Sequence, residues 1–186
     1  ISILRKESDV FNMKITYPED LFICEQLTRL NYYSVNHNDR FISGKFPKRV
    51  LLLGGSGGIG GAIREFMEGN GISYLAPSHK ELDLASMTVE HIKSFCKEFV
   101  PDAIINAAAA YFDDNAGLSD TFNIIFNVNV KANEILIEFA KTLGKKINLV
   151  FLSSSSSTKG RENLTNYSAA KAALNSIVES QAAILA

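Results

Sequence analysis

Cysteine is scarce in this sequence, and neither sign of charge dominates it. The only two cysteines, Cys24 and Cys96, lie far apart and form no metal-binding or redox pair, so we expect a reduced, cytoplasmic setting. Lys and Arg together number 19 and Asp and Glu 20, which leaves a formal net charge of −1. Such a balance argues against a surface that binds nucleic acid.

Long hydrophobic runs are also missing. No apolar stretch approaches the roughly 20 residues that a membrane-spanning helix needs, and no signal peptide opens the chain, so we expect no membrane partner. The chain begins at Ile1 rather than methionine, which suggests a fragment or a processed protein. Its 186 residues, 46% of them hydrophobic, suffice for one domain with a core.

The most informative stretch is RVLLLGGSGGIGGAIREF, residues 49–66. Its apolar run Val50–Leu53 predicts a central parallel strand that is buried on both faces. Gly54, Gly58 and Gly60 then follow with the spacing G-x-x-x-G-x-G before a helical pattern begins. Glycine lets the backbone approach a pyrophosphate, and the start of a helix attracts anions. The stretch therefore predicts a dinucleotide site.

Strand and helix patterns alternate throughout residues 48–186, which predicts an α/β fold with a doubly wound, Rossmann-type parallel sheet. Further strands are expected at 72–76, 103–105 and 147–152, and helices at 89–99, 121–143 and 167–186. Asn127 and Asn129 are poor choices for a helix interior. They hint at function, although an internal hydrogen bond would explain them equally well.

The end of the second expected strand favours one cofactor over another. In dinucleotide-binding folds an acid at this point selects NAD, whereas basic groups accept the extra phosphate of NADP. This chain has Ser78, His79 and Lys80 there and no acid before Glu81. We therefore expect NADP to be preferred over NAD. The alternative is that His79 and Lys80 are only solvated loop residues.

Tyr167 and Lys171 carry the predicted chemistry. They lie four residues apart on the last expected helix, so both side chains project from one face. A lysine ammonium stabilises a nearby phenolate, and the tyrosine then becomes a usable general acid and base. A strand-borne serine, Ser154, precedes Tyr167 by 13 positions.

Together these motifs resemble the short-chain dehydrogenase/reductase family over residues 48–186. The resemblance implies an NAD(P)H-dependent oxidoreductase that transfers hydride to a small carbonyl substrate, with NADP or NAD as cofactor and no metal. Leu53, Ala107 and Ala109 depart from the family pattern without removing a catalytic group. The implied catalytic residues are Asn129, Ser154, Tyr167 and Lys171. The implied cofactor-binding residues are Gly54, Ser56, Gly58, Ile59, Gly60, Ser78, His79, Asp83, Leu84, Asn106, Ala107, Ala108, Tyr167 and Lys171.

The family also implies roles and assembly. Ser154 would bind the carbonyl oxygen, Tyr167 would protonate it, Lys171 would hold the ribose hydroxyls and tune Tyr167, and Asn129 would position a water. Family members continue past the tyrosine helix with further strands, so we expect a C-terminally truncated, incomplete reductase domain. They also pair through their two long helices, so a homo-oligomer, a dimer or tetramer, is expected.

The N-terminal segment carries a second resemblance. NMKITYPEDLFICEQL, residues 12–27, is similar to the C-terminal end of methylerythritol phosphate and ribitol 5-phosphate cytidylyltransferases, with Lys14 as the family lysine. An ordinary docking helix is the competing interpretation. We therefore predict a short N-terminal extension that is a cytidylyltransferase-like tail (1–30), a linker (31–47) and the reductase domain (48–186).

Combining the two resemblances sharpens the functional hypothesis. A cytidylyltransferase tail ahead of a reductase is typical of bifunctional enzymes that reduce ribulose 5-phosphate with NADPH and then make CDP-ribitol, so the expected partner is a sugar phosphate. An alternative, suggested by NAAAAYFDD (106–114), is an NAD(P)-dependent sugar-nucleotide epimerase, dehydratase or reductase. A further alternative is a non-catalytic nucleotide-binding domain.

Overall fold

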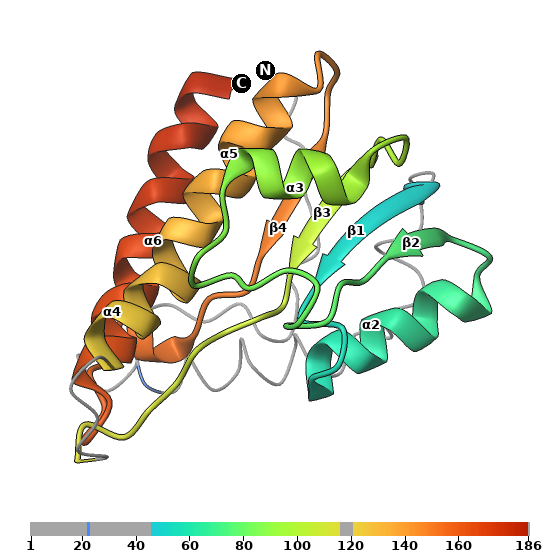
Figure 1. Ribbon diagram of the computed structural model, residues 1–186. Helices are drawn as coiled ribbons and strands as arrows, with labels where there is room; N and C mark the ends of the chain where they lie inside the picture. The colour runs from blue at the N-terminus through green and yellow to red at the C-terminus, as the bar shows by residue number, and fades with distance from the viewer. Residues whose placement is uncertain (1–21, 23–45, 116–120, 186) are drawn as a thin grey trace, which may run out of the picture. The chain divides into compact units, whose positions relative to one another are not determined.

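A parallel four-stranded sheet organises the domain (Figure 1). The computed structural model describes Phe22, residues 46–115 and residues 121–185. Its strands pair in the order β2-β1-β3-β4, and all three pairings are parallel. The strands are β1 (Arg49–Leu53), β2 (Ser73–Leu75), β3 (Ala103–Asn106) and β4 (Asn148–Phe151). Apart from Phe22, Phe46 and Pro47, the predicted tail and linker, including Lys14 and Cys24, lie outside the described residues.

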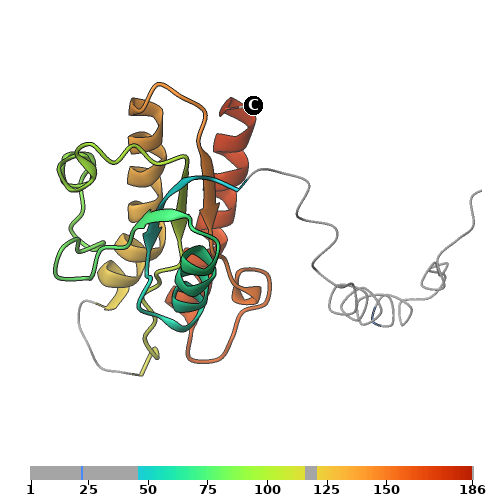
Figure 2. The same cartoon turned by 90° about the vertical axis from the view of Figure 1, so that its right-hand side faces the viewer.

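Helices cover both faces of this sheet, as Figures 1 and 2 show. Because successive strand residues point to opposite faces, Val50 and Leu52 pack with Met67 of α2, whereas Leu51 and Leu53 pack with α3 and α5. The helices are α2 (Gly58–Gly69), α3 (Val89–Cys96), α4 (Thr121–Phe126), α5 (Ala132–Thr142) and α6 (Thr165–Leu185). The predicted doubly wound α/β sheet is confirmed, with element ends shifted by a few residues.

The strand order places a crevice at one edge of the sheet. The chain leaves β1 toward β2 on one side and returns to β3 on the other, so the direction of winding reverses between β1 and β3. At this reversal Leu53, the last residue of β1, is in register with Asn106, the last residue of β3. Ligands of open α/β sheets bind at such switch points, outside the carboxyl ends of the strands.

The long helix expected at 121–143 is not a regular α-helix, and this expectation was wrong in its middle. A π-helical turn spans Asn127–Lys131 between α4 and α5. Asn129 is fully buried, and its Nδ2 donates to the carbonyl oxygens of Ile125 (2.9 Å) and Ala110 (2.7 Å). The Ile125 carbonyl is the ordinary α-helical acceptor for the Asn129 N–H. Competition by the side chain for that acceptor accounts for the wider turn, and such turns are frequent at functional sites.

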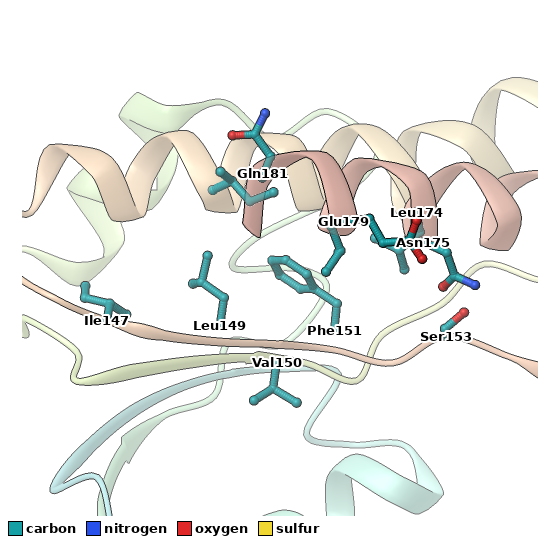
Figure 3. Close-up of a pocket in the computed structure, with 11 residues that line it drawn as sticks. Ile147, Leu149, Val150, Phe151, Ser153, Leu174, Asn175, Glu179 and Gln181 are labelled. Atoms are coloured by element: carbon teal, nitrogen blue, oxygen red, sulfur yellow. The ribbon is translucent and has the colours of Figure 1, made fainter. Parts of the chain in front are cut away.

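The outer edge of β4 is apolar. A cavity of about 520 Å³ lies along this strand beneath α5 and α6. Leu149 and Phe151 point toward the helices, whereas Val150 points to the opposite face, where it is 45% exposed (Figure 3). Among the described residues, β4 pairs only with β3. The strand therefore offers a free hydrogen-bonding edge flanked by hydrophobic side chains.

Candidate cofactor and active site

The glycine turn after β1 is folded tightly enough to require glycine at two positions. Gly54 has φ +78°, and a Cβ there would lie 2.5 Å from the Ala108 backbone nitrogen. A Cβ on Gly60 would lie 2.0 Å from the Gly54 carbonyl oxygen, well inside contact distance. In contrast, a Cβ on Gly58 would meet nothing within 4 Å. Gly54 and Gly60 thus allow the backbone to pack closely, and Gly58 keeps open the space in front of helix α2.

That space belongs to a cavity of about 950 Å³ at the carboxyl ends of β1 and β3. Three loops line it, one after each of β1, β2 and β3, together with one face of the α4 region. The cavity combines a glycine-rich turn, the start of a helix and an apolar flank. These are the properties that suit a dinucleotide, whose pyrophosphate needs backbone N–H groups and whose adenine needs apolar contact.

Most of the predicted cofactor-binding residues line this cavity. Those that do are Gly54, Ser56, Gly58, Ile59, Gly60, His79, Asp83, Leu84, Ala107 and Ala108. Ser78, Asn106, Tyr167 and Lys171 are not among its lining residues. Sequence reasoning missed Ile124 and Val128, which line the cavity from the π-helical region. Their i, i+4 spacing was an available signal, but it is equally typical of core residues.

The turn after β2 carries charges of both signs. The Ser78 backbone N–H (2.8 Å) and hydroxyl (2.7 Å) both donate to the Glu81 carboxylate, which lowers the pKa of Glu81. His79 Nδ1 lies 3.4 Å from the Asp83 carboxylate. Glu81 therefore folds back onto Ser78. The turn after β2, which the sequence suggested was free of acids, thus contains a carboxylate. The basic residues His79 and Lys80 remain exposed beside it.

Asn106 acts inside the protein rather than at the cavity surface. Its Oδ1 accepts the Ala108 N–H (3.0 Å), and its Nδ2 donates to Oδ1 of Asn133 (2.7 Å). Asn133 in turn donates to the backbone carbonyl of Asn129 (2.8 Å), in the π-helical turn. Since Asn129 also holds the Ala110 carbonyl, this chain of buried amides fixes the loop that forms the cavity floor. Asn133, which sequence reasoning passed over, is the central member.

Tyr167 and Lys171 lie together on α6, as their spacing requires. Lys171 Nζ is 5.7 Å from the centre of the Tyr167 ring and donates to the Leu152 carbonyl (2.9 Å), just past the end of β4. Only 2% of Lys171 is exposed, and burial lowers its pKa from 10.5 to about 8. The Tyr111 and Tyr167 rings pack in a T-shaped arrangement, with their centroids 5.8 Å apart. The lysine thus ties α6 to the strand that leads into Ser154.

Ser154 begins a 3-10 turn, Ser155–Ser157, so only the first serines of the tract continue from β4. Its Oγ accepts the backbone N–H of Ser156 at 3.1 Å. An accepted hydrogen bond leaves the hydroxyl hydrogen free to donate elsewhere. Asn129, the other predicted catalytic residue, has a buried Oδ1 with no hydrogen-bond partner among the described residues. The structure therefore gives each of these residues an unused polar atom.

The start of α6 is fastened to the loop after β3. The Asp114 carboxylate accepts the backbone N–H of Thr165 (2.8 Å), and the Asp114 N–H donates to the Asn163 carbonyl (2.9 Å). Hydrogen bonds from Thr165 lower the pKa of Asp114. Because Thr165 precedes Tyr167 by two residues, this contact fixes the end of the helix that carries the tyrosine.

Other kinds of site find less support. Within residues 46–115 and 121–185, no group of His, Cys, Asp and Glu is arranged to hold a metal ion. Burial raises the pKa of the Cys96 thiol to about 11, which disfavours the reactive thiolate. No helix in the described part of the chain has the length and apolarity to cross a bilayer.

The glycine turn, the switch-point cavity and the tyrosine–lysine pair define a nucleotide-binding α/β domain of the dehydrogenase and epimerase type. The chain belongs to the NAD dependent epimerase/dehydratase family, whose model matches residues 50–183. This is the wider family to which the alternative suggested by NAAAAYFDD pointed.

The chain is also similar to individual proteins and solved structures. The chain is 26% identical over 180 residues to the bifunctional ribulose 5-phosphate reductase/CDP-ribitol pyrophosphorylase Bcs1 of Haemophilus influenzae, covering 90% of this chain but only 38% of that protein. Its fold is similar to 4-hydroxyisoleucine dehydrogenase complexed with NADH (TM-score 0.64, 24% identity, 73% of this chain, 68% of that one). It is also similar to dTDP-4-dehydrorhamnose reductase from Bacillus anthracis in complex with NADP (TM-score 0.58, 20% identity, 74% and 51%).

Proposed function

We propose that this chain is the reductase part of an NAD(P)H-dependent oxidoreductase that reduces the carbonyl of ribulose 5-phosphate to give ribitol 5-phosphate. The observation that carries the proposal is the buried ammonium of Lys171, held between the Leu152 carbonyl and the Tyr167 ring. Burying an unpaired charge is costly, and proteins keep such groups mainly where the charge is used.

The residues fit a nicotinamide dinucleotide. Gly54, Gly58 and Gly60 would hold its pyrophosphate, and Asp83 with Leu84 would face its adenine, since all five line one cavity. When bound, the cofactor supplies a hydride for the carbonyl carbon. We propose NADPH over NADH, because exposed His79 and Lys80 flank the end of β2. The acids Glu81 and Asp83, which engage Ser78 and His79, reduce that preference.

The chain's own groups manage the substrate oxygen and its proton. Ser154 donates its free hydroxyl hydrogen to the carbonyl oxygen and so orients the substrate. Tyr167 Oη transfers its proton to that oxygen as negative charge develops there, and the product is the alcohol. Lys171, which uses one of its three N–H donors on Leu152, directs the others toward the phenolate and the ribose hydroxyls.

Asn129 has a role in returning a proton to Tyr167 after the reduction. Its Oδ1 is buried and has no partner in the described part of the chain, a cost that a bound water would relieve. We propose that Lys171 passes a proton to the Tyr167 phenolate and then recovers one from a water held by Asn129, which is itself replenished with a proton from the solvent.

The proposed substrate rests on the match to the bifunctional Haemophilus influenzae enzyme. That match covers 90% of this chain, more than residues 46–186 contain, so it extends into the N-terminal segment. This extent supports our proposal that residues 1–30 are the tail of a cytidylyltransferase domain, followed by a linker to residue 47. We further propose that the protein is cytoplasmic and forms a homo-oligomer through its two long helices.

A second candidate function is favoured by the family match itself. The matching family is named for epimerases and dehydratases, and NAAAAYFDD led us to the alternative of a sugar-nucleotide epimerase, dehydratase or reductase. An epimerase regenerates its cofactor in each cycle, so a tightly retained cofactor after purification would favour this candidate. A non-catalytic nucleotide-binding domain is disfavoured by the retention of Asn129, Ser154, Tyr167 and Lys171.

The test is to follow NADPH absorbance with ribulose 5-phosphate in the full-length protein. We expect oxidation that is faster with NADPH than with NADH and that falls about 100-fold or more in Tyr167→Phe, since general acid catalysis contributes on that scale. Tyr111→Phe is a matched control on the neighbouring ring. Binding of NADPH without turnover would move the search to nucleotide sugars, and no binding of either cofactor would favour the non-catalytic alternative.

A further inference from the structure

We propose that Arg161, assisted by Lys159, binds the phosphate of the substrate beside Ser154. This inference rests on the proposed function and adds to it the group that recognises the anionic end of the sugar. The backbone of the loop between β4 and α6 folds back onto Ser155. The Ser155 carbonyl accepts the backbone N–H groups of Thr158 (3.3 Å) and Lys159 (3.2 Å).

Arg161 differs from the other arginines that the structure describes. Arg49 stacks over the Phe99 ring at 4.4 Å and donates to the Glu98 carbonyl, and Arg64 lies 3.9 Å from the Glu68 carboxylate. Arg161 instead donates from Nη2 to the neutral Oγ of Ser155 at 3.1 Å. No carboxylate of the described residues forms an ion pair with it. Its charge is therefore available to an anion.

The acids on the facing loop are already engaged. Asp114 accepts the Thr165 N–H, and Asp113 accepts the N–H of Asn115 at 2.8 Å. Glu162, next to Arg161 in sequence, is exposed and makes no ion pair in the described part of the chain. The exposed Lys159 adds a second positive charge two residues before Arg161. Neither Lys159 nor Arg161 therefore forms an ion pair with a carboxylate of the described residues.

The position of Arg161 suits a short sugar phosphate. Ser155 follows Ser154 directly, and adjacent Cα atoms are about 3.8 Å apart. The guanidinium is therefore fastened one residue from the hydroxyl that we assign to the carbonyl oxygen. A pentose phosphate carries its carbonyl and its phosphate on one short carbon chain, so both groups can be held at once. Guanidinium binds phosphate through two parallel N–H donors, and only one of the five donors is used on Ser155.

The test compares ribulose 5-phosphate with unphosphorylated ribulose in the full-length protein. We expect Arg161→Gln to lower kcat/KM for ribulose 5-phosphate about 10- to 100-fold, as for a lost charged hydrogen bond, mainly through KM. The weak turnover of ribulose should stay unchanged. Arg161→Lys should restore part of the loss because it restores the charge without the planar fork. Arg64→Gln, which removes an arginine on α2, is the matched control and should affect neither substrate.

Two results would overturn the inference. One is an equal loss on both sugars in Arg161→Gln, which would make Arg161 a structural residue and leave the proposed reductase intact. The other concerns a wild-type protein that reduces neither sugar, in which case the proposed function fails and phosphate binding is measured by calorimetry instead. If the wild type binds no inorganic phosphate, the anion site is refuted. If it binds phosphate and Arg161→Gln abolishes this binding, the anion site is supported.

Discussion

Replacing Gly60 by alanine tests the packing of the glycine turn most directly. The new Cβ would lie 2.0 Å from the Gly54 oxygen and 2.7 Å from the Gly54 carbonyl carbon, both backbone atoms that cannot rotate away. Overpacking of this kind costs about 1–3 kcal/mol. Alanine returns up to about 1 kcal/mol through its helix propensity. We therefore expect the free energy of unfolding to fall by up to about 2 kcal/mol and the affinity for NADPH to fall with it.

Two neighbouring glycines of α2 provide matched controls. A Cβ on Gly61 would first meet an atom at 4.0 Å, so Gly61→Ala should raise the free energy of unfolding by about 0.5–1 kcal/mol. Gly58→Ala should also preserve stability, but it should weaken NADPH binding because Gly58 lines the cavity. Urea unfolding followed by circular dichroism, and NADPH titration by fluorescence, measure the two effects separately. Equal stability of the Gly60 and Gly61 variants would refute the packing argument.

Three further predictions follow from the buried polar groups. Asn133→Ala leaves the Asn106 amide without its acceptor and should cost about 1–3 kcal/mol in urea unfolding, whereas Asn123→Ala, at an exposed position of α4, should change the free energy of unfolding by less than about 1 kcal/mol. The folded pKa of Lys171, about 8, lies below its unfolded value of 10.5, so the unfolded chain binds more protons between these pH values and the free energy of unfolding should rise across that range. Lys171→Met should lack this rise, and an identical pH profile in both proteins would contradict the burial of a charge. The pKa of Asp114 is lowered by folding, so the stability that it contributes is present at neutral pH and lost as the pH falls through its folded pKa, and Asp114→Asn should remove that part of the acid dependence in thermal melts.

The sequence predicted those parts of the molecule that one local pattern determines. Val50–Leu53 is wholly apolar because its strand is covered on both faces, and the spacing of Tyr167 and Lys171 fixes them to one side of a helix. The role of Asn133 was not predictable in this way: its contact with the Asn129 carbonyl is local, but Asn106 lies on β3 and reaches Asn133 only when the helix packs against the sheet.

The turn after β2 illustrates a second limit. Its preference for NADP was inferred from the order of residues along the chain, in which Glu81 follows the basic pair. A reverse turn brings the Glu81 carboxylate onto Ser78, so position in sequence did not give position in space. The π-helical turn was also missed because of a side-chain contact that the order of residues does not reveal. There the Asn129 side chain competes with the backbone for the Ile125 carbonyl.

The free edge of β4 has a practical consequence for work on these residues. An unpaired strand edge beside exposed apolar side chains offers a template on which strands of other molecules can add, and folded proteins usually shield such edges. Because Val150 is 45% exposed beside this edge, we expect samples of these residues to associate in a concentration-dependent way. A dilution series that follows the oligomeric state is therefore the right first control. Val150→Lys is the substitution best placed to keep samples monodisperse.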